Sequence, residues 1–239
     1  LFLIYYTSFH TFLEVPLTKE VKHVTLVDDI NLKVPEGEVY ALLGANGAGK
    51  STILKMLVGI FKPTRGKILF EENPWRRENL EKIGSLIEFA PLYGNLTALE
   101  NLQVRCDLLN LPYEDIDEVL KIVDLSDTNK KKSKYFSVGM KQRLGIALAL
   151  INHPKLLILD EPTNGLDPIG IQEMRDLILS FKAQGITIII SSHILSEVQE
   201  IADTIGIVRE GRLVYQEKFE KSKDLTELFM ENVKEWSVK

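Results

Sequence analysis

The chain has 239 residues, of which 45% are hydrophobic and 26% charged, and its formal net charge at neutral pH is −5. This composition is typical of a globular protein with a sizeable core, and the negative charge excludes the global positive field that favours nucleic acid. The basic run NKKKSK at 129–134 predicts a solvated loop, with a local binding patch as the alternative. The single cysteine, Cys106, excludes an intramolecular disulfide and agrees with a reducing compartment.

An apolar segment, LFLIYYTSFHTFLEV, begins the chain. It lacks a basic leading part and is shorter than the roughly 20 residues that cross a bilayer, so it predicts neither a signal peptide nor a membrane span. No later apolar run comes closer to that length. We assign no role to the first dozen residues.

Strands and turns are predicted for residues 24–70. The alternation in VTLVDDINLKV and the turn residues PEG that follow it predict a strand and a turn. Val39–Leu43 is a continuous apolar run, which is typical of a buried strand. After a turn at 63–66, strand character returns at 67–70, which indicates an antiparallel sheet beside the core.

Helical patterns dominate residues 91–152. The sequence TALE at 97–100 is a capping box that predicts a helix start, and apolar spacing predicts two more helices at 116–123 and 138–151. The chain then returns to strands at Leu156–Leu159 and Ile186–Ile190, with helices between them, which indicates a parallel α/β arrangement. A last helix, with an apolar face over 225–233, is predicted to pack on the body.

The segment GANGAGKS, Gly44–Ser51, fits the phosphate-binding pattern G-x-x-x-x-G-K-[ST] between a predicted strand and a predicted helix. Its glycines let successive N–H groups face phosphate oxygens, and the helix start adds the positive end of its dipole. Lys50 would reach the outer phosphates and the Ser51 hydroxyl would ligate Mg²⁺. The pattern predicts a nucleoside triphosphate with magnesium; a glycine-rich turn without a ligand is the alternative. The predicted nucleotide-binding residues are Gly44, Ala45, Asn46, Gly47, Ala48, Gly49, Lys50, Ser51 and Thr52.

Asp160 and Glu161 end the apolar strand at 156–159, where open parallel sheets place their ligands. One carboxylate can hold magnesium there, while its neighbour acts as general base toward the attacking water. We expect Asp160 to bind the metal and Glu161 to be catalytic. The alternative is that the pair caps the next helix.

Together these motifs resemble the ATP-binding subunit of ATP-binding cassette (ABC) transporters, over residues 17–215. That family carries an LSGGQ signature in its helical insertion, and FSVGM at 136–140 stands in its place, with departures at Val138 and Met140. The resemblance implies a single α/β domain, 1–239, with the P-loop NTPase fold of ABC type: a mixed sheet core, an antiparallel β subdomain and a helical signature subdomain. The implied boundaries are 1–89 with 153–215 for the core, 90–152 for the helical subdomain and 216–239 for a helical tail.

In the family the signature serves the nucleotide of the facing subunit. The resemblance therefore implies a head-to-tail dimer of two copies, with two ATP molecules and Mg²⁺ between them. Asp167 looks like the D-loop residue that links the two sites. His193 looks like the switch histidine at the γ-phosphate, catalytic together with Glu161 and Lys50. The residues implied to contact ATP across the dimer are Ser137, Val138, Gly139 and Met140.

Two positions depart from the family. Val21, with His23 nearby, stands where an aromatic residue usually stacks on adenine. Glu88 stands where a glutamine usually contacts magnesium and relays motion to the membrane subunit; a carboxylate can still ligate Mg²⁺ but cannot donate an amide hydrogen bond. A surface salt bridge is the alternative role of Glu88. With LTALENL and YFSVGMKQRLGIA, this form is similar to the subgroup of bacterial transporters for lantibiotic protection or bacitracin resistance.

The resemblance implies an ATPase that powers export or expulsion of a membrane-active peptide antibiotic. Its partners would be a second copy and integral membrane permease subunits, with no nucleic acid, and its place would be cytoplasmic, peripheral on the inner face of the cell membrane. An exporter of another cargo, a soluble ABC ATPase acting on ribosomes or DNA, and a nucleotide-gated subunit without turnover are the alternatives. The presence of Lys50, Asp160, Glu161 and His193 disfavours the last of these, and a single cassette without a long coiled-coil insertion disfavours the soluble ATPase.

Overall fold

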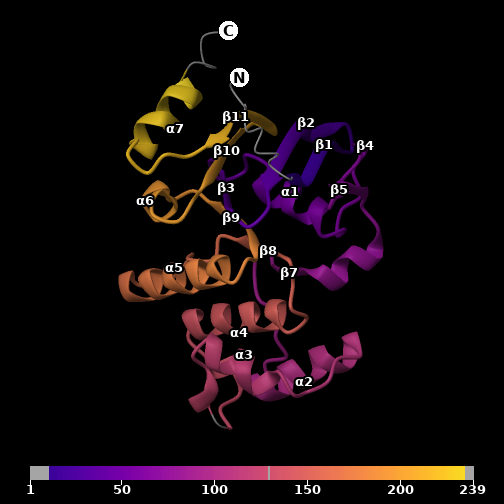
Figure 1. The fold of residues 1–239 in the computed structure, drawn as a ribbon, viewed down its shortest axis with the longest axis vertical. Coiled ribbons are helices and arrows are strands. Elements are labelled where there is room, and N and C mark those ends of the chain that lie inside the picture. The colour runs from indigo at the N-terminus through magenta and orange to yellow at the C-terminus, as the bar shows by residue number, and fades with distance from the viewer. Residues whose placement is uncertain (1–10, 129, 235–239) are drawn as a thin grey trace, which may run out of the picture.

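The computed structural model describes residues 11–128 and 130–234 of the chain. Its strands form two sheets, and helices flank them (Figure 1). Within the described ranges, no helix is long and apolar enough to cross a bilayer. Residues 1–10, the greater part of the apolar N-terminal segment, lie outside these ranges.

The larger sheet has six strands in the order β11, β10, β3, β9, β8, β7. Its first pair, β11 and β10, is antiparallel, and all other neighbours are parallel. The sheet is therefore mixed, with a parallel centre, as predicted. The strands are β3 (Val39–Leu43), β7 (Ile83–Leu86), β8 (Leu156–Asp160), β9 (Thr187–Ser192), β10 (Thr204–Arg209) and β11 (Arg212–Lys218).

Side chains of β3 are buried on both faces of this sheet, which explains its continuous apolar run. Val39, Ala41 and Leu43 pack into one core cluster, together with apolar residues of the helices α2 to α7. Tyr40 and Leu42 pack into a second cluster, which lies between the sheet, α1 and the antiparallel strands. The phosphate-binding segment follows β3 and is thus anchored at the centre of the core.

The second sheet is antiparallel, with the strand order β2, β1, β5, β6 and β4 paired to β1. No strand was predicted before residue 24, but β1 pairs with β2 along its length. The turn between them, Lys22 and His23, has positive φ at both positions and lacks the Asn or Gly that normally marks such a hairpin. Of the strand predicted at 67–70, only Leu69–Phe70 forms a strand, β5, and the short strand β4 (Arg65–Gly66) lies within the turn predicted at 63–66. The strands are β1 (Thr11–Val21), β2 (Val24–Pro35), β4 (Arg65–Gly66), β5 (Leu69–Phe70) and β6 (Asn73–Pro74).

Three helices, α2, α3 and α4, gather at one end of the molecule (Figure 1). The predicted capping box is confirmed at the start of α2, where Thr97 and Glu100 exchange side-chain and backbone hydrogen bonds. The predicted packing of the last helix is also confirmed, because Leu225 is buried. The helices are α1 (Lys50–Leu57), α2 (Ala98–Leu109), α3 (Ile116–Ile122), α4 (Val138–Leu150), α5 (Pro168–Ala183), α6 (Leu195–Gln199) and α7 (Leu225–Lys234), with short 3₁₀ helices at Arg77–Lys82, Ser126–Thr128 and Ser133–Tyr135.

The helical end is joined tightly to the sheet through α4 and β7. A Cβ atom on Gly84 would lie 2.1 Å from the carbonyl oxygen of Ala149, so only glycine fits there. A Cβ atom on Gly145 would lie 2.7 Å from the Cβ atom of Ala90. The helical end therefore contacts both the edge strand β7 and the linker 87–97 that follows it.

Candidate active site

The phosphate-binding segment connects β3 to α1. Gly47 and Gly49 have φ of 81° and 111°, which other residues rarely adopt. Gly49 is the N-cap of α1 and leaves the first turn without a side-chain cap. Backbone N–H groups at a helix start that lack side-chain partners form a site for anions. The segment thus presents backbone N–H groups of the kind that the predicted phosphate-binding loop requires.

Lys50 is held inside this loop. Its ammonium group donates to the carbonyl oxygens of Gly44, at 2.7 Å, and Ala45, at 3.3 Å. It also lies 3.3 Å from Oε1 of Glu161, and the Lys50 residue is only 5% exposed. The lysine is therefore a positioned cation at the mouth of the loop, paired with the carboxylate that was predicted to be catalytic.

Glu161 stands between two predicted site residues. Its Oε2 atom lies 2.7 Å from Nδ1 of His193, while Oε1 faces Lys50. Its backbone has a φ of 50°, and its N–H donates to the hydroxyl of Ser191 at 3.0 Å. The three side chains come from segments that follow parallel neighbouring strands: Lys50 follows β3, Glu161 follows β8 and His193 follows β9. They therefore meet at the carboxyl-terminal ends of these strands.

Asp160 is buried at the end of β8. Its Oδ1 atom accepts a hydrogen bond of 2.5 Å from the Ser191 hydroxyl on β9. This hydroxyl orients the Asp160 carboxylate and links it to the backbone N–H of Glu161. A hydroxyl and a carboxylate are oxygen donors of the kind that Mg²⁺ prefers, so Ser51 and Asp160 are suitable metal ligands.

A cavity of about 360 Å³ opens over the loop. Glu161, directly after β8, lines it on one side, and Leu26 lines it from β2. Leu26 was missed, because nothing in the sequence indicates that strand β2 passes the loop. The other lining residues are Asn46, Gly47, Ala48, Gly49, Lys50, Ser51 and Thr52.

The signature segment, 136–140, lies outside the phosphate-loop cavity. Ser137 is the N-cap of α4, where its hydroxyl accepts a hydrogen bond from the Met140 N–H at 3.2 Å. Asp167 caps α5 in the same way, accepting from the Gly170 N–H at 2.8 Å. Both caps border a hollow of about 470 Å³, which Val138 and Gly139 also line. None of the described residues lining this hollow belongs to the phosphate-loop cavity, so one chain does not bring the two groups together.

Val21 and Glu88 lie apart from the described lining of the loop cavity. Val21 pairs with Val24 across the tip of the β1–β2 hairpin and is 42% exposed. The Glu88 carboxylate contacts Nζ of Lys55 on α1 at 2.5 Å. The structure therefore places Glu88 in the salt bridge that was its alternative role, although this pair is formed with the helix that carries Lys50 and Ser51.

Comparison with known proteins places these motifs in a family. The family model described as ABC transporter matches residues 27–164. The chain is 53% identical over 213 residues to the lantibiotic transport ATP-binding protein SrtF of Streptococcus pyogenes, covering 89% of this chain and 93% of the relative. It is 50% identical to the bacitracin transport ATP-binding protein BcrA of Bacillus licheniformis, covering 90% of this chain and 72% of that relative.

Solved structures agree with this assignment. An ATP-binding subunit of an ABC transporter superposes with a TM-score of 0.83 at 29% identity, over 93% of this chain and all of the other. The dimeric MJ0796, a bacterial ABC transporter cassette, superposes with a TM-score of 0.78 at 25% identity, over 87% of this chain and 99% of the other. The chain belongs to the ABC transporter family, as an ATP-binding subunit with the ABC ATPase fold.

Proposed function

We propose that this chain is the ATPase that powers export or expulsion of a membrane-active peptide antibiotic, of lantibiotic or bacitracin type, through separate membrane subunits. The observation that carries the proposal is the contact of Glu161 with both Lys50 and His193 at the mouth of the phosphate loop. The names of the relatives SrtF and BcrA support the class of cargo. Those names likewise support a cytoplasmic position, peripheral on the inner face of the membrane.

Each site residue has a role in hydrolysis. The backbone of Gly44–Thr52 would hold the phosphates, and Lys50 would neutralise the charge of the outermost one. Mg²⁺, held by Ser51 and Asp160, would neutralise the charge that develops on the phosphate oxygens. Glu161 would accept a proton from the attacking water, and His193, 2.7 Å from Glu161, would orient the γ-phosphate.

The second half of the site comes from another copy of the chain. The signature N-cap at Ser137 and the phosphate loop lie in separate cavities, so the N–H groups at the start of α4 are available to a nucleotide bound elsewhere. A head-to-tail dimer would place the residues Ser137 to Met140 on the partner's ATP. Asp167, in the hollow of the signature segment, would link the two sites. The dimeric cassette among the structural neighbours supports this arrangement.

Val21 and Glu88 keep the roles that the sequence assigned to them, as proposals. Val21, exposed at the tip of the β1–β2 hairpin, would contact the nucleotide base, and Leu26, which lines the loop cavity from β2, would support that contact. Glu88 would act at the metal or in coupling, and its ion pair with Lys55 supports the coupling role, because that pair ties the linker 87–97 to α1. We also propose the division of the chain into a nucleotide-binding core, 1–89 with 153–215, a helical subdomain, 90–152, and a helical tail, 216–239.

Two measurements test the proposal. Cells that express the chain with the membrane subunits of its own locus should survive a lantibiotic or bacitracin, and Glu161→Gln should abolish this protection. Survival that is unchanged by Glu161→Gln would refute it. In light scattering with Mg-ATP, the Glu161→Gln protein should form a dimer, because the unhydrolysed γ-phosphate holds the contacts across the interface. A protein that stays monomeric would refute the closure of the dimer.

A further inference from the structure

A buried hydrogen bond lies behind the candidate catalytic residues Glu161 and His193. The hydroxyl of Thr163, in the loop after β8, donates to Oε2 of Glu197 on α6. Both partners are only 7% exposed. Glu161 and His193 stand at the start of the same two segments, directly after β8 and β9. The bond therefore connects the loop that carries the proposed general base to the helix that follows the histidine.

Short turns join each partner of this bond to a candidate catalytic residue. The turn that begins at Glu161 is closed by a backbone hydrogen bond of 3.1 Å to its carbonyl oxygen, and Thr163 lies inside that turn. On the other side, the Glu197 N–H donates to the carbonyl oxygen of Ile194 at 3.3 Å, in the turn directly after His193. A shift of Thr163 relative to Glu197 would therefore move Glu161 relative to His193.

The backbone at Glu161 requires contacts that hold it. Its φ of 50° is one that residues other than glycine rarely adopt, and such a conformation persists only where the surrounding structure maintains it. The Ser191 hydroxyl binds the Glu161 N–H on one side, and the bond of Thr163 to Glu197 holds the loop on the other. Without the second contact the loop could relax, and the Glu161 carboxylate would leave its position 2.7 Å from His193.

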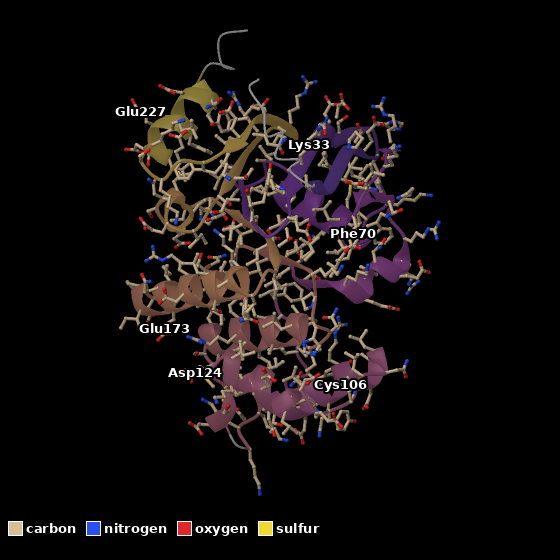
Figure 2. The ribbon with its side chains drawn as sticks, in the orientation of Figure 1. Lys33, Phe70, Cys106, Asp124, Glu173 and Glu227 are labelled. Carbon is tan, nitrogen blue, oxygen red and sulfur yellow. The ribbon has the colours of Figure 1, made fainter. Side chains whose placement is uncertain are left out.

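A small cavity of about 10 Å³ adjoins the bond, and Arg175 of α5 lines it together with Thr163 and Glu197. The Nε atom of Arg175 is buried and has no hydrogen-bond partner in the part of the chain that the structure describes. Glu173, on the same helix and labelled in Figure 2, is exposed and pairs instead with Arg143 of α4 at 2.6 Å. Glu197 is the anionic side chain among the described residues of the cavity, so its carboxylate has a hydroxyl partner and a cationic neighbour.

We propose that Glu197 is a positioning residue for ATP hydrolysis, which acts through Thr163 to keep the Glu161 carboxylate in its place beside His193. The inference rests on the proposed function, because it concerns the reaction at Glu161. Neither Thr163 nor Glu197 is among the described residues that line the phosphate-loop cavity. Loss of their bond should therefore slow the chemical step and leave ATP binding close to normal.

The experiment measures ATP turnover by the full chain in complex with the membrane subunits of its own locus. Thr163→Val removes the hydroxyl and keeps the shape of the side chain, so kcat should fall by about tenfold to a hundredfold. The dissociation constant for ATP, measured by equilibrium titration, should stay close to the wild-type value. Thr163→Ser retains the hydroxyl and should restore most of kcat. Glu200→Ala, at an exposed carboxylate directly after α6, is the matched control and should turn over ATP normally.

A double variant separates positioning from stability. Thr163→Val combined with Glu197→Met replaces both partners by apolar side chains of similar size, so the Tm should stay near that of the wild type. Its kcat should still fall as far as that of Thr163→Val alone, because the two changes remove one bond. A normal kcat in either variant would overturn the inference, and so would an ATP dissociation constant that rises as much as kcat falls. A wild-type complex that hydrolyses no ATP would refute the proposed function instead, so the two failures are distinguishable.

Discussion

Glu161→Gln should tighten ATP binding as well as stop hydrolysis. Glu161 lies 3.3 Å from the Lys50 ammonium, which in the proposed function would also contact the outermost phosphate. The carboxylate therefore competes with the phosphate for the same cation, and it repels the phosphate charge. Glutamine has nearly the same shape and no charge, so the competition and the repulsion both weaken.

The magnitude follows from the distance. Two unit charges at 3.3 Å attract by about 5 kcal/mol at an effective dielectric constant of about 20. Much of this attraction is offset, because the Glu161 side chain is 21% exposed to water and glutamine can still accept from Lys50. We expect Glu161→Gln to gain about 1.4 kcal/mol in the free energy of ATP binding, which lowers the dissociation constant about tenfold. Turnover should fall by about 10²–10⁴-fold, the usual contribution of a general base.

The assay is an equilibrium fluorescence titration with ATP in the absence of magnesium, at protein concentrations too low for dimers. Glu71→Gln is the matched control, because Glu71 also bridges two cations, Lys82 at 2.6 Å and Lys155 at 2.5 Å, outside the phosphate-loop cavity. Equal dissociation constants for wild type and Glu161→Gln would refute the competition. An equal increase in ATP affinity in Glu71→Gln would show that the effect does not arise from the contact of Glu161 with Lys50.

Three further outcomes are expected. Gly84→Ala should lower the free energy of unfolding by about 1–3 kcal/mol in denaturant titration, because its Cβ would meet the Ala149 carbonyl; an unchanged midpoint would contradict that close contact. Glu100 has its pKa lowered to about 2, mainly by the hydrogen bond from the Thr97 backbone, so its contribution to stability is full above pH 4.5 and is lost as the pH falls toward 2. The difference in Tm between wild type and Glu100→Gln should therefore shrink over that range. Glu88→Ala should reduce antibiotic resistance more than basal ATP hydrolysis.

Local patterns in the sequence predicted the elements that carry the candidate nucleotide site. The run Val39–Leu43 is apolar because β3 is buried on both faces, and the glycine pattern after it depends only on neighbouring residues. The capping box of α2 is likewise local. Strand β1 was missed because its hairpin turn, Lys22 and His23, has the φ values of a turn without its usual residues.

Contacts between distant segments could not be predicted in the same way. The pair of Lys50 and Glu161 depends on the order β3, β9, β8, and that order is a property of the whole sheet. Leu26 reaches the loop cavity only because β2 passes over it. A salt bridge was predicted as the alternative role of Glu88, but the sequence did not identify Lys55 as its partner. The position of Glu88 depends on the packing of the linker 87–97 against α4, which the sequence does not reveal.

The partner of Glu88 explains why coupling should be more sensitive than hydrolysis to Glu88→Ala. In the structure its carboxylate holds Lys55 on α1, while Lys50 at the start of that helix retains its own contacts with Gly44 and Glu161. Removal of the carboxylate frees the linker from α1 and leaves the phosphate loop intact. ATP hydrolysis would then proceed without a matching movement of the linker, and it would be uncoupled from transport. Resistance and hydrolysis that fall by the same factor would instead indicate that Glu88 acts at the metal.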